Sequence, residues 1–294
     1  MIHSDVLIPN VPGVFQLVKI IGVGGQAEVN LYINEETGEE VAVKRFFDDE
    51  QFGDAVSETE ITALEMLKPY NHPRICNLIH KTQDSRPQII TPYYKNSDLA
   101  SSVETKFDGK VPPLGFKWHV FVQLVEALAF IQYGCGADSE NLTEPQPNWN
   151  AIYHGDIKRN NILVTSKYDG PEGTSYPNIV LHDFGISRLQ SNVHVDQRVY
   201  RLCIDVEHAV LLMFSLDFIG ASRFLLEEDL LEFMEGQSEE GKELYEWLRR
   251  VYFEDDLSSL ELLRDMVPKG KEILANLGKE EGANKARFVL TAES

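Results

Sequence analysis

Two short polar stretches, each next to an apolar run, most constrain what this chain can fold into. The first is YHGDIKRNNILV, Tyr153–Val164, with a carboxylate at Asp156, a lysine at Lys158 and an amide at Asn161. The second is HDFGISR at 182–188, whose aspartate follows Asp156 by 27 positions. Either stretch alone is weak, because Asp-Phe-Gly is an ordinary turn. Both together at this spacing are hard to obtain by chance, and they indicate one polar site.

Together the two stretches resemble the catalytic loop and the metal-binding turn of the eukaryotic-type protein kinases, whose loop reads H-R-D-x-x-x-x-N before D-F-G. Here the loop reads His154, Gly155, Asp156 and then Asn161, and Asp183 begins the D-F-G turn. The resemblance implies phosphoryl transfer, for which the protein supplies positioning and charge neutralisation rather than covalent chemistry. It implies that Asp156 orients the attacking hydroxyl and accepts its proton.

The same resemblance implies roles for the neighbouring polar groups. Lys158 would neutralise charge on the transferred phosphoryl group. Asn161 and Asp183 would hold one or two Mg²⁺ ions, because magnesium prefers hard oxygen ligands, keeps several waters and also binds substrate phosphates. We therefore expect ATP and Mg²⁺ as cofactors.

A glycine-rich segment, GVGGQAEV at 22–29, lies between expected strands. These strands are Phe15–Ile21, Asn30–Ile33 and Glu40–Phe46. A turn built mostly of glycine lets backbone N–H groups approach phosphates. No helix follows it, unlike a Rossmann fingerprint, and no Gly-Lys-Ser/Thr follows it, unlike a Walker loop. With Lys44 of VAVK 15 residues after Val29, the segment resembles the kinase glycine-rich loop and phosphate-pairing lysine, although Ala27 replaces the third glycine.

The resemblance also implies a nucleotide site. Its members are Gly22, Gly24, Gly25, Val29, Ala42, Lys44, Thr91, Tyr93, Tyr94, Asp98 and Leu163. Gln88–Tyr94 is expected to be a buried strand that runs into the hinge, with Thr91 at the back of the adenine pocket. Pro92 has no backbone N–H, but Tyr94 would still offer one to the adenine. Asp98 either meets the ribose or caps the helix that begins after it.

Asp54–Leu67 has the apolar spacing of a helix. In the resemblance, a glutamate of this helix pairs with Lys44, and Glu60 fits the register best. Glu58 lies within one turn and is the alternative. A further strand is expected at Cys76–His80.

Composition narrows the class of partner and compartment. The chain has 294 residues and a net charge of −20, so nucleic acid and anionic membranes are poor partners, whereas a basic protein or peptide substrate is easier to accommodate. Three scattered cysteines at positions 76, 135 and 203 fit a reducing compartment. The N-terminus lacks the features of a signal peptide. We expect an intracellular protein, cytoplasmic or nuclear; the sequence does not indicate an oligomeric state.

The segment after Asp183 departs most from the kinase pattern. Leu202–Leu216 is expected to be the central helix, and the resemblance implies that its Asp205 is buried and holds the catalytic-loop backbone. Only 22 positions separate Asp183 from Asp205, where kinases carry an activation loop, a docking loop and an Ala-Pro-Glu element. Gly155 also replaces the arginine that pairs with a phosphorylated activation loop. We therefore expect no regulation by activation-loop phosphorylation.

The remaining segments are expected to be helices and insertions. The helices are Leu114–Tyr133, Glu227–Met234, Glu239–Tyr252, Ser258–Met266 and Lys269–Leu277. The apolar stretch Ala209–Leu226 contains two charged residues and is predicted to be a buried helix rather than a membrane span. Polar insertions are expected at 134–150 and 168–177, and the final residues 282–294 are expected to be poorly ordered.

The resemblance covers about Phe15 to Leu216. It implies an α+β, bilobal kinase-like fold in a single domain, 1–294. A small β-rich N-lobe would cover about 12–94, a hinge about 92–97 and a mainly helical C-lobe about 98–281, before the tail.

Three functions stay open on the sequence. The first is an active serine/threonine protein kinase, which Lys158 favours over a tyrosine kinase. The second is a small-molecule kinase, since aminoglycoside- and choline-type phosphotransferases often carry HGD and lack the docking segment. The third is a pseudokinase, a regulatory module that binds a partner and nucleotide.

Overall fold

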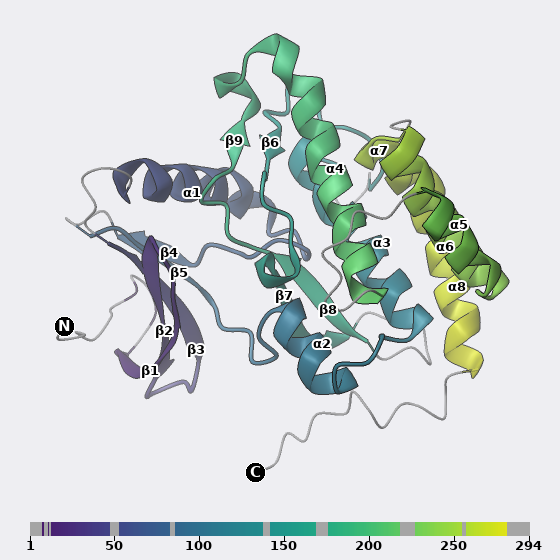
Figure 1. The fold of residues 1–294 in the computed structure, drawn as a ribbon. Coiled ribbons are helices and arrows are strands. Elements are labelled where there is room, and N and C mark those ends of the chain that lie inside the picture. Colours follow the sequence, from purple (N-terminus) through teal and green to yellow (C-terminus); the bar gives the residue numbers. More distant parts are fainter. Residues whose placement is uncertain are drawn as a thin grey trace. The chain divides into compact units, whose positions relative to one another are not determined.

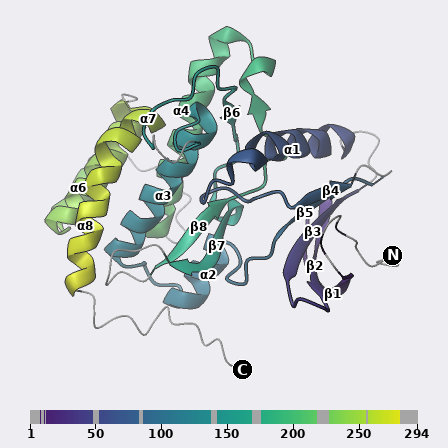
Figure 2. The same cartoon turned by 180° about the vertical axis from the view of Figure 1, so that it is seen from behind.

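The computed structural model describes Ile8, Val11 and residues 13–47, 53–82, 86–137, 142–168, 176–217, 227–254 and 257–280. The chain forms two compact units, whose elements are labelled in Figures 1 and 2. Unit 1 comprises residues 1–94 and 183–187, and unit 2 comprises 95–182 and 188–294. The expected tail 282–294 lies outside the described residues.

Unit 1 is built on a five-stranded antiparallel sheet with the strand order β1-β2-β3-β5-β4. Its elements are β1 (Phe15–Val23), β2 (Ala27–Asn34), β3 (Glu40–Phe46), α1 (Gly53–Leu67), the short 3-10 helix η1 (Lys68–Tyr70), β4 (His80–Thr82) and β5 (Gln88–Pro92). The β2–β3 turn is closed by Asn34, whose Oδ1 accepts hydrogen bonds from the N–H groups of Glu36 and Thr37. Gly38 completes the turn with a φ of 73°.

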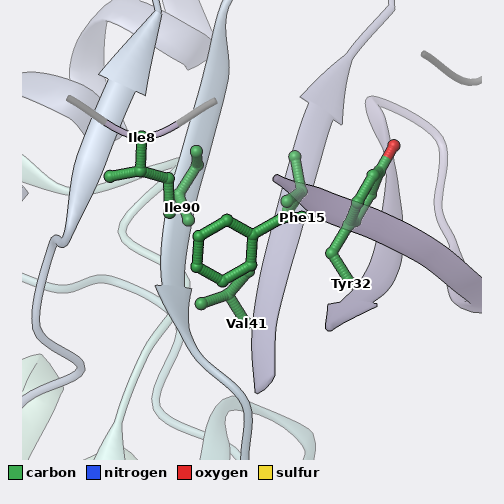
Figure 3. Packing of buried hydrophobic residues seen from close by; sticks show 6 residues of the cluster. Ile8, Phe15, Tyr32, Val41 and Ile90 are labelled. Carbon is green, nitrogen blue, oxygen red and sulfur yellow. The ribbon is translucent and has the colours of Figure 1, made fainter. Parts of the chain in front are cut away.

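One apolar cluster holds this sheet to the segment before it. Phe15, Tyr32, Val41 and Ile90 come from four strands, and Ile8 reaches them from the N-terminal segment (Figure 3). All five are at most 5% exposed. Burying a large apolar side chain stabilises a fold by roughly 1.5–3 kcal/mol, so this cluster holds the four strands and the segment that carries Ile8 together.

Unit 2 is mainly helical and is organised around α3 (Leu114–Tyr133), which matches its predicted bounds. The other elements are α2 (Leu99–Phe107), β6 (Ile152–Tyr153), η2 (Arg159–Asn161), β7 (Ile162–Tyr168), β8 (Pro177–Leu181), β9 (Arg188–Leu189), η3 (Gln190–Asn192), α4 (Val195–Asp217), α5 (Glu227–Glu235), α6 (Glu239–Arg249), η4 (Arg250–Glu254), α7 (Ser259–Glu261), η5 (Leu262–Met266) and α8 (Val267–Glu280). Strands β6 and β9 pair, and β7 pairs with β8.

Helix α3 packs against both α4 and α8, as Figures 1 and 2 show. It is long and apolar enough to cross a membrane by length and composition alone, but 89% of its most apolar window is buried inside the structure. A Cβ atom on Gly270 of α8 would lie 2.6 Å from Val122 Cγ2 and 3.0 Å from Trp118 of α3. This glycine therefore permits the close approach of the two helices.

Several predicted bounds were wrong. The strand predicted at Cys76–His80 is shifted along the chain, because the ladder of β4 with β5 runs from His80 to Thr82. The Ile79 N–H still donates to the Ile90 carbonyl, but Cys76 and Leu78 are buried without joining the ladder. The helix predicted from Leu202 begins at Val195, seven residues earlier. The buried helix predicted at 209–226 is helical to Asp217, and its remainder lies outside the described residues.

The C-terminal helices are also more continuous than predicted. The two helices predicted to be separated near Pro268 form one helical run, from α7 through η5 to α8. Pro268 is the second residue of α8 and follows the π-helical turn η5. A proline lacks the N–H that an interior helical position needs, and it is tolerated at such a junction. The described part of the insertion at 134–150 contains no helix or strand, and most of 168–177 lies outside the described residues.

A buried ion pair in unit 2 supports a prediction about stability. Lys117 Nζ lies 2.6 Å from Asp217 Oδ1 and 2.7 Å from Tyr245 Oη, and both charged side chains are at most 5% exposed. We expect Lys117→Met to lower the free energy of unfolding by about 3–5 kcal/mol, because it leaves a buried carboxylate without its cation. Urea denaturation followed by tryptophan fluorescence measures this loss.

Lys242→Met is the matched control. The Lys242–Glu239 pair is exposed on both sides, so its loss should cost less than about 1 kcal/mol. Equal effects of the two substitutions would contradict a structural role for the buried pair.

Candidate active site

The charged residues predicted from the sequence form two groups, one in each unit. In unit 1, Lys44 lies on β3, opposite Val29 of β2 and Ile89 of β5. Its Nζ is 2.7 Å from Glu60 Oε2 and 2.8 Å from Asp183 Oδ1. The structure therefore brings together three residues that lie far apart in the sequence.

Helix α1 presents Glu60 to this lysine and turns Glu58 to solvent. Glu60 is 4% exposed, whereas Glu58 is exposed. Burial raises the pKa of Glu60, and the attraction of Lys44 opposes that rise. Burial by itself would lower the pKa of Lys44, but Glu60 and Asp183 outweigh it, so its net pKa is raised. Lys44 therefore keeps its positive charge at neutral pH.

The Asp183–Ser187 turn is held close to α1. Asp183 has a φ of 65°, a left-handed conformation that is uncommon for a residue other than glycine. Phe184 is fully buried, and its carbonyl accepts a hydrogen bond from the Ser187 N–H. A Cβ atom on Gly185 would lie 3.2 Å from Val56 Cγ1 and 3.5 Å from Glu60 Oε2. Glycine therefore lets the turn approach α1 closely enough for Asp183 to reach Lys44.

The glycine-rich turn joins β1 to β2. Gly24 N–H donates to the carbonyl of Ala27 at 2.9 Å, and Gly22 lies opposite Val29 in the strand pairing. A Cβ atom on Gly25 would meet nothing within 4 Å. Ala27, the departure from the kinase pattern, is 5% exposed, so its methyl group is accommodated inside the fold rather than at the tip of the turn.

The predicted adenine-side residues lie around β5. Ala42 of β3 pairs with Thr91 of β5, and the Tyr93 N–H donates to the Glu40 carbonyl at 3.4 Å. Thr91 and Tyr94 both hydrogen bond to the Cys76 side chain. Burial raises the pKa of this thiol to about 12, so Cys76 is a structural residue rather than a reactive one.

In unit 2, the catalytic-loop residues predicted from the sequence form a compact cluster. Lys158 Nζ lies 2.6 Å from Asp156 Oδ2. Asn161 Nδ2 donates to the same carboxylate oxygen at 2.8 Å and to the Asp156 carbonyl at 2.9 Å. The Asp156 side chain remains 32% exposed. The carboxylate is therefore oriented by an amide and a cation and is still accessible to an incoming group.

Asp205 of α4 holds the backbone that carries this cluster. Its two oxygens accept the N–H groups of His154 and Gly155, each at 2.7 Å. His154 is fully buried, and its Nε2 is 3.0 Å from the His182 carbonyl oxygen. Gly155 has a φ of 78°, which explains why a glycine suits the position where kinases carry arginine. Burial raises the pKa of Asp205 to about 6, although its two backbone N–H partners lower it.

Asp98 and Leu163 lie together in unit 2. Asp98 Oδ1 accepts the Ser101 N–H at 2.9 Å and caps α2, which favours the capping alternative over ribose contact. Its backbone forms an isolated bridge to Leu163 of β7. This bridge attaches the start of α2 to the strand that follows the catalytic loop.

One residue that supports the site was missed by the sequence analysis. Gln132 Oε1 accepts from Ser259 Oγ at 2.6 Å, and its Nε2 lies 3.5 Å from Asp205 Oδ2. A signal was present, because Gln132 is a polar residue near the end of a strongly apolar helix. A buried polar group needs a partner, and this one lies beside the anchoring carboxylate.

Each unit carries one oxygen ligand of the kind that magnesium prefers. The amide nitrogen of Asn161 makes its two hydrogen bonds to Asp156, which leaves its Oδ1 as a donor to a cation. Asp183 supplies a carboxylate that is 37% exposed. Among the described residues no three or more His, Cys, Asp or Glu side chains gather as a metal site. Magnesium needs no such cluster, because waters and substrate phosphates supply most of its ligands.

Comparison with known proteins agrees with this geometry. The family model for the protein kinase domain matches residues 15–203. CBL-interacting serine/threonine-protein kinase 3 of Arabidopsis thaliana is 25% identical over 193 residues, which are 65% of this chain and 37% of that protein. Cyclin-dependent kinase-like 5 of Homo sapiens is 27% identical over 161 residues, which are 54% of this chain and 15% of that protein. The chain thus spans well under half the length of these relatives.

The buried carboxylate of Asp205 predicts a pH dependence of stability. Its pKa of about 6 in the folded chain exceeds the ordinary aspartate value near 4, so the folded state binds the proton more tightly than the unfolded state does. The stability that this proton contributes is present at pH 4 and is lost as the pH rises through 6. We therefore expect Asp205→Asn, which cannot ionise, to gain up to about 3 kcal/mol relative to the wild type between pH 4 and 7.

Urea denaturation at several pH values measures this change. The test uses only how the difference in unfolding free energy between Asp205→Asn and the wild type changes with pH. The cost of placing the asparagine amide opposite two N–H groups is the same at every pH, so it does not affect this change. Asp229→Asn makes the same chemical change at an exposed position of α5 and is the matched control. A constant difference for Asp205→Asn, or one of opposite sign, would disprove the assignment.

Proposed function

Because the chain belongs to the protein kinase family, we propose that it is an active, ATP- and Mg²⁺-dependent serine/threonine protein kinase. The observation that carries this proposal is the Asp156–Lys158–Asn161 cluster, in which all three side chains are in contact. Asp205 holds the backbone next to this cluster by accepting the His154 N–H. In unit 1 the Lys44–Glu60 pair is formed as well.

The residues have separate tasks in the proposed reaction. The substrate hydroxyl oxygen bonds to the γ-phosphorus of ATP, the bond from that phosphorus to the β,γ-bridging oxygen breaks, and ADP leaves. Asp156 orients the hydroxyl and accepts its proton, and Asn161 fixes the orientation of the Asp156 carboxylate. Lys158 and Lys44 contribute positive charge where negative charge must be stabilised. Mg²⁺, when bound through Asn161 and Asp183, would neutralise phosphate charge.

Two considerations support a serine/threonine acceptor in a protein. Lys158 stands two residues after Asp156, as in the serine/threonine class, and a serine/threonine kinase is among the relatives.

Composition supports a class of substrate and a location. The net charge of −20 favours basic substrates through its long-range field and disfavours nucleic acid and anionic membranes. The cysteine usage supports an intracellular location.

The short connection from Asp183 to Asp205 supports constitutive activity. Strand β9, η3 and the first turns of α4 account for this connection in the structure. Gly155, with its positive φ, stands where kinases use arginine to bind a phosphorylated loop. We therefore propose that activation-loop phosphorylation does not regulate this kinase.

Asp156→Asn is the first test of the proposal. We expect phosphoryl transfer from ATP, either to the protein itself or to a Ser/Thr peptide library, to fall on the order of 10³-fold or more. The reason is that the acceptor hydroxyl loses the group that takes its proton. Asp229→Asn makes the same chemical change at an exposed site and should leave transfer unchanged. Mg²⁺-ATP binding without transfer by the wild type would favour a regulatory nucleotide-binding module. Transfer only to small hydroxyl compounds would favour a small-molecule kinase.

The ion pair of unit 1 supports a second prediction. Glu60→Gln should lower kcat on the order of 10²-fold, because Lys44 loses the buried carboxylate that positions it. Glu58→Gln, two residues away on the same helix but exposed, is the control and should act like the wild type. If both variants had the same kcat, the Lys44–Glu60 pair would have no positioning role. The measurement is steady-state transfer at saturating Mg²⁺-ATP.

A further inference from the structure

A pocket beside the catalytic loop has no role in the function proposed so far. It has a volume of about 430 Å³ and lies wholly within unit 2. One side is formed by the catalytic-loop residues 156–160 and the other by α4. This volume is within the range of roughly 300–1,000 Å³ that is usual for ligand sites. Because Asp156 and Lys158 line it, the pocket opens directly onto the proposed catalytic group.

The α4 side of the pocket is a single face of the helix. His208, Leu211, Leu212 and Ser215 line it, at spacings of three, four and seven residues, which place them on one stripe. The stripe is about 10 Å long at 1.5 Å per residue. An extended peptide covers that length with about three residues. The shape therefore suits a short stretch of extended chain.

The chemistry of the pocket is apolar at its base and not acidic at its rim. Ile157 and Leu212 are at most 5% exposed, whereas Leu211 is 39% exposed and presents an apolar side chain to solvent. The charges of Asp156 and Lys158 offset each other at 2.6 Å. Arg159 adds a further positive charge to the lining. The pocket offers no net negative charge to a basic side chain of a ligand. An apolar side chain could instead bury the exposed surface of Leu211.

We propose that this pocket binds the substrate peptide next to its acceptor hydroxyl, with an apolar flanking side chain placed against Leu211. The inference rests on the proposed function and adds a specificity determinant to it. Helix α4 takes this role because the short connection after Asp183 carries no docking loop. Any preference for basic residues then acts at positions farther from the acceptor.

The test uses the full chain with Mg²⁺-ATP and a peptide library that carries one Ser or Thr acceptor. Leu, Arg or Glu is fixed in turn at each of the four positions on either side of the acceptor. We expect Leu to be preferred at one position within three residues of the acceptor. With a peptide of that sequence, Leu211→Glu should raise the peptide KM about tenfold, because the contact that buries the leucine is lost. The KM for ATP should stay the same.

Leu231→Glu is the matched control, since Leu231 is 46% exposed on α5 and lies outside the pocket lining. It should keep both the leucine preference and the peptide KM of the wild type. Leu211→Met should keep most of the affinity. If Leu211→Glu proves unstable by thermal shift, Leu211→Ala should raise the peptide KM in the same direction by a smaller factor.

The outcomes separate this inference from the function on which it rests. Transfer by the wild type with an unchanged peptide KM in Leu211→Glu would overturn the pocket assignment and leave the kinase proposal standing. A preference for Arg at every flanking position would also overturn it. No transfer by the wild type, either to itself or to any peptide, would overturn both proposals. Transfer to itself but to no peptide would overturn only the pocket assignment, and transfer to small hydroxyl compounds alone would assign the pocket to a small acceptor.

Discussion

The hydrogen bonds that the Asp205 carboxylate accepts from the backbone N–H groups of His154 and Gly155 are the interaction on which unit 2 depends. The carboxylate is fully buried, so it is accommodated only because those donors, with Gln132 beside them, replace the water that it has lost. The backbone that they fix carries Asp156 at the right place for Lys158 and Asn161 to contact its side chain. The packing of α4 in the core and the position of Asp156 therefore both depend on Asp205.

Unit 1 solves a similar problem with a different arrangement. A buried glutamate from α1 and the carboxylate of Asp183 share one lysine from β3. The turn that carries Asp183 reaches this lysine because a glycine passes close to α1. In both units a buried charge is compensated by groups from a separate element, and in both a glycine permits the backbone path. The β-rich unit and the helical unit are those expected of the protein kinase fold.

Much of the fold could be predicted from the sequence, because the spacing of apolar residues within a segment indicates whether it forms a strand or a helix. Strand β3 and helix α3 have the predicted bounds, and the choice between Glu60 and Glu58 followed from helical register. The errors arose where tertiary contacts decide. Gln132 was missed because its partner Ser259 is 127 residues away. The continuity past Pro268 depends on a π-helical turn that leaves no clear mark in the sequence. The α4 pocket could not be predicted, because the spacing of residues gives the faces of a helix but not which segment packs against each face.

Helix α4 carries Asp205 on a buried face and, from the next turn onward, the residues that line the pocket. His208 is three positions from Asp205, and Leu212 is seven, so the same helical turns serve both purposes. Any shift or rotation of α4 that accommodates a new acceptor must also displace the carboxylate that supports the catalytic loop. Laboratory evolution of a new substrate preference through α4 should therefore yield variants whose turnover changes together with their selectivity, and compensating substitutions should appear in α3 around Gln132.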